Sequence, residues 1–221
     1  GKTYIWAAWS DGTTNASEID TFNDTPTNYE SGGTVHGNFC TLNPLDKGAD
    51  VNTVVNGNLE ATWNSNNGHS IRGTMGVSSG KYYWEATGFA VLSVGIIKTG
   101  LPIVPSSGSL FPGGSGFGAG GSYGYYAANG SKATNGTVTS YGASIATSDT
   151  VGVALNLDDG EITFYKNNAS QGVAFTGISG TFAPAFGYQN SGTNNLKVNF
   201  GATGSFKYTP PTGFKALCTQ N

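Results

Sequence analysis

The sequence predicts one large all-β domain, built as a sandwich of two antiparallel sheets. Short segments rich in Val, Ile, Thr, Tyr and Phe alternate with turn sequences at close spacing, which is typical of sandwiches. No segment keeps its apolar residues at a helical period, so no helix is expected. A chain of 221 residues fits one such domain, because all-β sandwiches of roughly 200–250 residues fold as single units.

The composition indicates a folded, turn-rich chain. Charged residues make up 10% of the sequence, against about 25% in an average soluble protein. Aromatic residues at 12%, together with many aliphatic side chains, supply enough apolar area to fill a core. We therefore expect a surface covered mainly by uncharged polar groups.

The expected strands follow from their β-branched and aromatic content and from the turn sequences that flank them. Asn-Gly or Asp-Gly pairs beginning at positions 56, 129, 135 and 159 suit tight reversals with positive φ. In chain order, the expected strands are 3–9, 59–63, 70–77, 81–87, 90–98, 124–128, 137–141, 150–157, 161–166, 172–175, 182–188 and 196–200.

The clearest pair of strands lies in the segment VGVALNLDDGEITFYKNN, which begins at Val151. Aliphatic residues at 151, 153, 155 and 157 alternate, which places them on one face of a strand. Asp159-Gly160 then reverses the chain, and Ile162 and Phe164 return on a second strand. This pattern predicts two adjacent core strands.

Two other stretches lack strand patterns. Residues 106–122 are rich in Gly and Ser and too long for an ordinary turn, which predicts an extended loop. Residues 12–38 are polar and without periodicity, so the strand at 3–9 is expected to belong to a preceding module. We divide the chain into an N-terminal strand and connector, 1–37, and the sandwich domain, 38–221.

Charge and hydropathy argue against several classes of partner. The net charge is −3 and no basic patch occurs, so no nucleic-acid partner is expected. The longest apolar runs, such as 89–94, are far below the ~20 residues that span a bilayer. The amino terminus, GKTYIWAAWSDG, lacks the order of a signal peptide.

The two cysteines, Cys40 and Cys218, lie near opposite ends of the chain. One interpretation is two separate buried thiols, since Cys is among the most buried residue types. The alternative is a disulfide between neighbouring terminal strands, and closing so long a loop would stabilise by about 4–5 kcal/mol. Both alternatives stay open. With His36 and His69 as the only other soft ligands, no metal site is expected.

Three segments resemble the SPRY family. SGKYYWEAT at 79–87, followed by VLSVGII at 91–97, resembles the central strand pair of SPRY domains. SDTVGVALNLDDGEITFYKNNASQGVAF at 148–175 is similar to the most distinctive SPRY segment, and TFAPAFGYQNSGTNNLKVNFG at 181–201 resembles the closing strands. The resemblance runs from about residue 38 to the end, and it implies a concanavalin A-like antiparallel jelly roll.

Flanking segments resemble the SPRY domains of bacteriophage and prophage virion proteins, especially tail fibres. They are CTLNPLDKG at 40–48, HSIRGTMGVSSGKYYWE at 69–85, GYYAANGSKATNG at 124–136 and YTPPTGFKALCTQN at 208–221. This resemblance implies one module among several on the virion surface, acting outside the cell beside other virion proteins. A homo-oligomer in the full-length fibre would fit that setting. The resemblance does not transfer a ligand.

No catalytic residues and no cofactor are expected. Retaining glycosidases on related folds need two carboxyl groups about 5–5.5 Å apart, but no E-x-D-x-E arrangement occurs. Asp158, Asp159 and Glu161 surround a turn, which indicates solvated residues. Glu85 lies within an expected strand and is interpreted as a half-buried acid, with Arg72 as a candidate ion-pair partner.

Glycine-rich and serine motifs also fail to predict chemistry. GGSGFG at 113–118 lacks the Lys and the following helix of a phosphate-binding loop. A G-x-S-x-G nucleophile elbow needs a strand-turn-helix setting, and no helix is expected here. The sequence therefore predicts a protein that is not an enzyme.

Polar and aromatic loop residues remain as candidates for binding. Three groups of residues combine aromatic rings with amide side chains, which are types that line ligand pockets. An alternative for each aromatic residue is a place in the core, and His69 alternatively has a structural or merely exposed role. The predicted ligand-binding set is Tyr126, Asn129, Tyr188, Asn190, Asn194, His69 and Asn66.

Two functions fit these observations. The first is a non-catalytic module of a tail fibre that recognises host-surface glycan or protein through its loops, with affinity multiplied by several copies. The second is a structural or protein–protein interaction module within the virion, without direct host binding.

Overall fold

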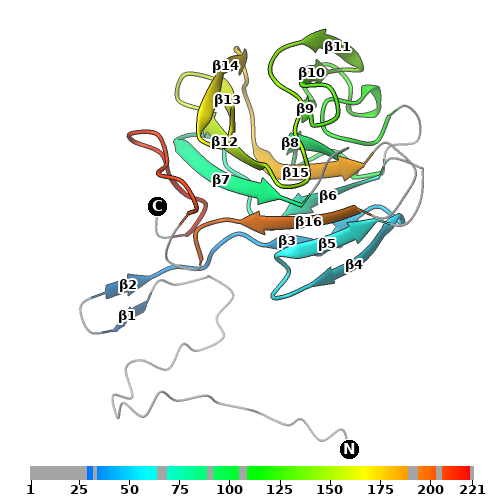
Figure 1. Cartoon of the computed structure of the whole chain (residues 1–221). Helices are drawn as coiled ribbons and strands as arrows, with labels where there is room; N and C mark the ends of the chain where they lie inside the picture. Colours follow the sequence, from blue (N-terminus) through cyan, green and yellow to red (C-terminus); the bar gives the residue numbers. More distant parts are fainter. Residues whose placement is uncertain are drawn as a thin grey trace, which may run out of the picture.

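The computed structural model describes residues 29–31, 34–63, 69–88, 92–104, 109–188, 194–202 and 206–219. In this part of the chain, two largely antiparallel sheets pack face to face (Figure 1). A separate hairpin pairs β1 (Tyr29–Ser31) with β2 (Thr34–His36). The strand expected at 3–9 lies outside the described residues.

Each sheet has a continuous strand order. From edge to edge, the seven-stranded sheet consists of β11 (Thr137–Ser140), β10 (Ser131–Thr134), β9 (Ser122–Tyr126), β8 (Leu92–Lys98), β15 (Phe182–Tyr188), β6 (Ser70–Gly73) and β3 (Leu42–Lys47). The eight-stranded sheet consists of β14 (Ala169–Phe175), β13 (Glu161–Lys166), β12 (Thr150–Asn156), β7 (Lys81–Thr87), β16 (Asn194–Asn199), β5 (Glu60–Trp63) and β4 (Val51–Val55), with β17 (Lys215–Ala216) pairing in parallel with β7.

The hairpin predicted around Asp159-Gly160 is confirmed. β12 pairs with β13 in register from Val151 opposite Lys166 to Asn156 opposite Glu161. Gly160 has a φ of 67°, the left-handed conformation that this reversal requires. The aliphatic residues of β12 are fully buried, and the other edge of the strand pairs with β7. The two packed antiparallel sheets also confirm the expected all-β jelly-roll sandwich.

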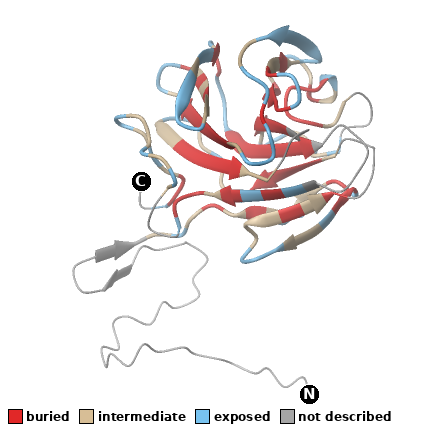
Figure 2. Ribbon diagram, in the orientation of Figure 1, coloured by how far each residue is buried: buried red, intermediate tan, exposed pale blue. Residues whose placement is uncertain are grey.

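The core lies between the sheets and consists of alternate residues from each strand. Large buried side chains include Trp84 of β7 and Phe164 of β13 from one sheet, and Phe186 of β15 from the other. Figure 2 shows this buried layer in red along the middle strands. Burying a large apolar side chain stabilises by about 1.5–3 kcal/mol, so this layer is the main source of stability.

Six strands lie where none was expected: β1, β2, β3, β4, β10 and β17. Three of them, β3, β4 and β10, belong to the two sheets and have more than two residues. β3 contains Pro44, β4 is flanked by a turn rich in Asn and Gly, and β10 has only four residues. Each has weak strand propensity or sits beside turn residues, and β3 and β4 are edge strands. Tertiary pairing rather than local sequence therefore sets these three.

The described part of the glycine- and serine-rich stretch, from residue 109, covers the outer face of the seven-stranded sheet. Ser93 Oγ on that face donates a hydrogen bond to the Pro112 carbonyl at 2.7 Å. A Cβ added at Gly124 would lie 2.0 Å from the same carbonyl oxygen, so only glycine fits there. The 3₁₀ turn Ser115–Phe117 buries Phe117 against the outer face of the sheet. The segment that was expected to be an extended loop therefore packs against the outer face of the seven-stranded sheet.

A buried arginine holds the end of β8 and the start of the connection that follows it. Arg72 is 4% exposed and forms a forked pair with Asp46, with N–O distances of 2.7 and 3.1 Å. Its remaining N–H groups donate to the carbonyls of Lys98 and Leu101. The expectation that Glu85 pairs with Arg72 was wrong, because the two side chains lie on different sheets. The acid that pairs with Arg72 lies on the neighbouring strand β3.

The two ends of the domain lie side by side, but the two thiols are free. Phe39 lies opposite Cys218, and the N–H of Cys40 donates to the Leu217 carbonyl at 2.9 Å. This register offsets the cysteines by one residue. Because neighbouring residues of an extended chain point to opposite faces, the two sulfurs point apart. The structure therefore has two separate buried thiols, not a disulfide. Burial raises the pKa of the Cys40 thiol to about 11.

Candidate binding site

One end of the sandwich, here called the loop end, gathers the predicted binding residues. Strand register shows this: Tyr188 lies opposite Leu92, Ser93 opposite Tyr126, and Asn194 opposite Trp63. β5, β7, β9 and β15 end here, and β6, β8 and β16 begin here. In Figure 1, β5 and β15 run towards this end at the right of the view. Segments far apart in sequence therefore meet at one surface.

The predicted residues divide into two groups. Asn66 and Asn190 lie outside the described residues. The backbones of Tyr188 and Asn194 lie at the loop end, as the last residue of β15 and the first of β16. His69 directly precedes β6, and Tyr126 ends β9, with Asn129 in the turn that follows. The fold thus brings the five described members of the set to the same end.

His69 is held by contacts that the sequence did not indicate. Its ring is 12% exposed, and its Nδ1 accepts a hydrogen bond from the backbone N–H of Asp50 at 3.2 Å. The Asp50 carboxylate lies 3.3 Å from the same nitrogen. The His69 carbonyl accepts a hydrogen bond from the indole N–H of Trp63 at 3.0 Å. His69 therefore joins the turn before β4 to the loop end.

The ring of Tyr126 is buried rather than presented to solvent. It is 9% exposed and packs edge-on against Phe111, with ring centroids 5.1 Å apart. Burial raises the pKa of its hydroxyl. Within the described residues, this hydroxyl has no hydrogen-bond partner. Of the two alternatives for this aromatic residue, the structure thus shows the place in the packed interior, where the Tyr126 ring packs beneath the surface of the loop end.

Asn129 is exposed and structurally constrained. Its Oδ1 accepts a hydrogen bond from the backbone N–H of Ser131 at 3.0 Å. Gly130 follows with a φ of 72°, and its N–H donates to the Tyr126 carbonyl at 2.9 Å. This turn is therefore rigid and displays the Asn129 amide nitrogen at the loop end.

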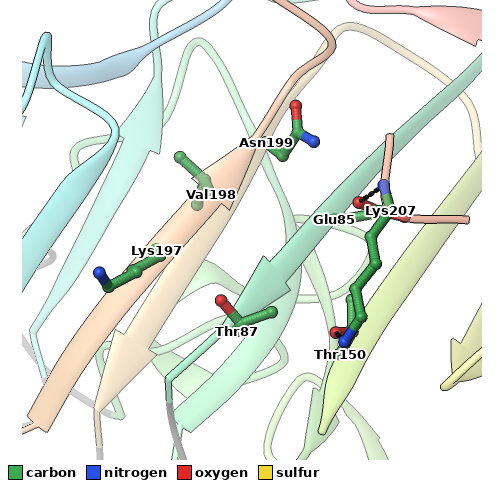
Figure 3. A pocket seen from close by; sticks show the side chains of 7 residues that line it. All are labelled: Glu85, Thr87, Thr150, Lys197, Val198, Asn199 and Lys207. Atoms are coloured by element: carbon green, nitrogen blue, oxygen red, sulfur yellow. Dashed lines mark hydrogen bonds between the residues drawn. The ribbon is translucent and has the colours of Figure 1, made fainter. Parts of the chain in front are cut away.

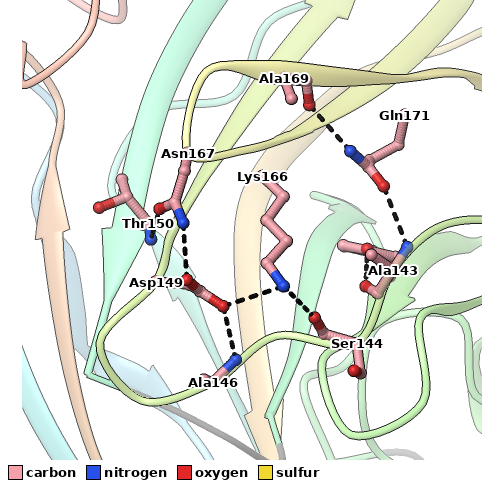
Figure 4. A network of polar contacts seen from close by, with 10 residues as sticks. Ala143, Ser144, Ala146, Asp149, Thr150, Lys166, Asn167, Ala169 and Gln171 are labelled. Atoms are coloured by element: carbon pink, nitrogen blue, oxygen red, sulfur yellow. Dashed lines mark hydrogen bonds and ion pairs between the residues drawn. The ribbon is translucent and has the colours of Figure 1, made fainter.

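A polar network holds the connection before β12 next to the turn between β13 and β14 (Figure 4). The Asp149 carboxylate accepts hydrogen bonds from the Ala146 N–H at 2.8 Å and from the Asn167 amide at 2.6 Å. Lys166 Nζ lies 3.2 Å from it. The Ala146 N–H and the Asn167 amide hold the pKa of Asp149 below its ordinary value. Since Thr150 lies opposite Thr87, this network borders the loop end.

Glu85, which the sequence singled out, has a structural role. It is 3% exposed, and its carboxylate accepts hydrogen bonds from the backbone N–H groups of Lys207 and Tyr208, both at 2.8 Å. The Tyr83 hydroxyl donates a third at 3.2 Å. Glu85 therefore fastens the segment that follows β16 onto the outer face of the eight-stranded sheet.

An open pocket of about 190 Å³ lies beside this contact (Figure 3). Lys207 reaches across it and donates from Nζ to Thr150 Oγ1 at 2.9 Å. Lys197 on its rim pairs with Glu60 at 3.0 Å. The chain's own side chains thus satisfy most of the polar groups in this pocket, so we place the candidate site at the loop end.

In the described part of the chain, no three His, Cys, Asp or Glu side chains are grouped so that they could hold a metal ion. No helix among the described residues is long and apolar enough to cross a membrane.

Sequence reasoning missed two contributors to the loop end. Asp50 lies 19 positions from His69 and in a stretch with no strand signal. Phe111 belongs to a stretch that was interpreted only as a loop. A large aromatic residue within a glycine-rich segment was the one available signal, because such a ring needs a place to pack.

Comparison with known proteins identifies a family match over the centre of the chain. Residues 81–203, more than half of the chain, match the family model described as the SPRY domain. Two relatives are 31% identical: the ATP-dependent RNA helicase DDX1 of Xenopus laevis over 186 residues, and Ddx1 of Drosophila melanogaster over 162. These matches cover 81% and 68% of this chain, and 23% and 19% of the relatives.

A third relative, the E3 ubiquitin-protein ligase RKP of Arabidopsis thaliana, is 42% identical over 81 residues, which is 35% of this chain and 6% of the relative. The chain therefore spans less than a quarter of the length of each of these relatives. All three relatives are eukaryotic proteins, so they do not support the virion setting that the flanking segments imply.

Solved structures show the same fold. The SPRY domain of human HERC1 superposes with a TM-score of 0.54 at 20% identity, covering 71% of this chain and 96% of that one. The TRIM65 PSpry domain gives 0.56 at 16% identity, covering 73% and 90%. At these identities the likeness speaks for the fold alone.

Proposed function

Because this chain belongs to the SPRY family, whose members are protein–protein interaction modules, we propose that it binds a protein partner through its loop end, without catalysis. The observation that carries the proposal is the strand register. It brings the ends of three connections between the two sheets, and the turn at Asn129, to one surface. Binding residues commonly lie on loops that a rigid scaffold positions.

The chemistry of the loop end favours a polar peptide segment as ligand. Two described polar side chains at the loop end are Asn129, which presents an amide, and His69, whose Nδ1 accepts a hydrogen bond from the Asp50 N–H. A strongly charged ligand would find no compensating charge among these groups. Asn side chains offer both donors and acceptors to a peptide backbone.

A second candidate is recognition of host-surface glycan by a virion protein, as the tail-fibre resemblance implies. Asn and Tyr residues at the loop end favour it, since amides and aromatic rings suit sugar hydroxyls and sugar faces. In that setting a structural contact with other virion proteins is the further alternative.

The test is selection of binders by the immobilised chain from a random peptide library, with a glycan array in parallel. We expect peptides with micromolar affinity, and we expect Asn129→Ala and Tyr188→Ala to weaken them about tenfold or more. Thr176→Ala, at an exposed position on the opposite end, is the control and should leave the affinity unchanged. Glycan binding without peptide binding would favour the second candidate. Selected peptides insensitive to both loop-end variants would refute the placement of the site.

A further inference from the structure

Four strands form the outer edges of the two sheets in the described structure. β11 and β3 bound the seven-stranded sheet, and β14 and β4 bound the eight-stranded sheet. An edge strand exposes unpaired backbone N–H and C=O groups, and proteins protect such edges with bulges, prolines, charges or covering groups. The four edges differ in how far they are protected.

β3 is protected by its shape and charge. Its register with β6 shifts between Leu42 and Lys47, so the residues between them bulge out of the ladder. This bulge contains Pro44, which has no N–H to donate, and Asp46, which is drawn towards Arg72. A further strand cannot extend the seven-stranded sheet in regular register at this edge.

β14 is protected by side chains that use its carbonyl groups. Lys132 Nζ donates to the Ala174 carbonyl at 2.5 Å, and the Tyr141 hydroxyl donates to the Gly172 carbonyl. The pairing with β13 is also irregular at two places. These contacts occupy acceptors that an added strand would need.

β4 has this protection only at its start, where its pairing with β5 shifts register between Val51 and Thr53. The rest of the strand, Thr53–Val55, pairs regularly with β5. Its sequence VNTVV contains no charge and no proline, and consists mainly of residues that favour strands. Lys47 Nζ donates to the Val51 carbonyl at 2.7 Å, at the start of the strand. Val54 packs on the core and fixes the strand in place. Figure 2 shows that most of β4 is only partly buried or exposed.

Exposed apolar side chains accompany this edge. Val55, the last residue of β4, is 45% exposed. Leu45, in the bulge of β3, is 96% exposed, and β3 and β4 contact each other. A partner strand on β4 would therefore gain both backbone hydrogen bonds and apolar burial.

β11 pairs regularly with β10 and has no protecting contacts among the described residues, but Val138, 48% exposed, is its one large apolar side chain. All four of its residues are exposed, on a hairpin that stands at the top of the view in Figure 1. A strand added there would gain hydrogen bonds with little further burial. Of the two edges, β4 is the better site for association.

We propose that a second copy of this chain pairs with β4, antiparallel and about a twofold axis, so that the eight-stranded sheets of two copies become continuous. In such a contact the same strand meets itself. Like charges would then repel, and β4 carries none. The net charge of −3 adds only weak repulsion between copies. One strand pair with its flanking side chains is a small interface, so the dimer is weak and forms at high micromolar concentration.

The test is sedimentation of the chain from about 5 to 500 µM, with two matched variants. Val55→Lys places a charge on the β4 edge, and Val138→Lys places the same charge at a 48% exposed valine on β11. We expect a monomer–dimer equilibrium that Val55→Lys weakens at least about tenfold and Val138→Lys leaves unchanged. Thermal melts confirm that both variants fold.

A second measurement on the unmodified chain locates the contact. Amide hydrogen exchange at high and low protein concentration should show slower exchange in β4 at high concentration. A chain that stays monomeric throughout the range overturns the proposal. So does a dimer that Val138→Lys disrupts and Val55→Lys does not.

Discussion

Replacing Glu85 by glutamine is the sharpest test of how the chain after β16 is held. The carboxylate is buried and accepts three hydrogen bonds, from two backbone N–H groups and the Tyr83 hydroxyl. An amide keeps one acceptor oxygen and turns an NH₂ group towards donors. At least one of the three donors then has no acceptor.

The expected loss follows from that count. A buried donor without an acceptor costs about 1–3 kcal/mol, and hydrogen bonds to a charged group are stronger than to a neutral one. We expect Glu85→Gln to lower the free energy of unfolding by about 2–3 kcal/mol. At about 2–4 °C per kcal/mol for a chain of this size, the melting temperature falls by roughly 4–12 °C.

The assay is equilibrium unfolding in guanidinium chloride, with hydrogen exchange of the Lys207 and Tyr208 amides as a local readout. Glu161→Gln, at a half-exposed position on β13, is the matched control and should change stability by less than about 0.5 kcal/mol. A Glu85→Gln chain as stable as the control, with slow exchange at both amides, would refute the reasoning.

Three further predictions concern the scaffold. Arg72→Lys should lower the free energy of unfolding by about 3 kcal/mol in a denaturant titration, because lysine cannot form the two hydrogen bonds that Arg72 donates to Asp46. A loss below about 1 kcal/mol would contradict the structural role given to this pair. The pKa of Asp149 is lower in the folded chain than its ordinary value of about 4. The ionised carboxylate therefore stabilises the fold above about pH 4, and this stabilisation is lost as the pH falls through the folded pKa. Asp149→Asn should therefore be less stable than the unmodified chain at pH 7, with a gap that narrows below about pH 4; a constant gap contradicts this. Cys40, buried and with a pKa of about 11, should react with a soluble disulfide reagent at pH 8 only after denaturation; rapid reaction of the folded chain would be inconsistent with its burial.

Much of the fold could be predicted from local sequence patterns. β12 and β13 were predictable because their apolar residues alternate around a turn that fixes the register. β3 and β4 were not, because Pro44 and the Asn residues around β4 favour turns when read locally. These strands form because neighbouring strands pair with them. The strand propensity of the individual residues does not include this pairing and so does not predict it.

The candidate site shows the same limit. The residue types at the loop end were predictable from composition, but their partners were not. Asp50 meets His69, and Asp46 meets Arg72, only through pairings between strands whose register is set by the whole sandwich. For the two cysteines, the sequence left two alternatives open, separate buried thiols or a disulfide between neighbouring terminal strands. The two segments are neighbours, and a one-residue offset in their register keeps the thiols apart.

The central claim is that the loop end binds a protein segment, and a footprint of the bound state tests it most directly. A peptide selected from the random library is added at saturation, and amide exchange is compared with and without it. We expect slower amide exchange at Ser70, at Ser93 and in the turn from Tyr126 to Gly130 when the peptide is bound. Protection confined to the opposite end, at the turns of residues 56–59 and 157–160, would contradict it.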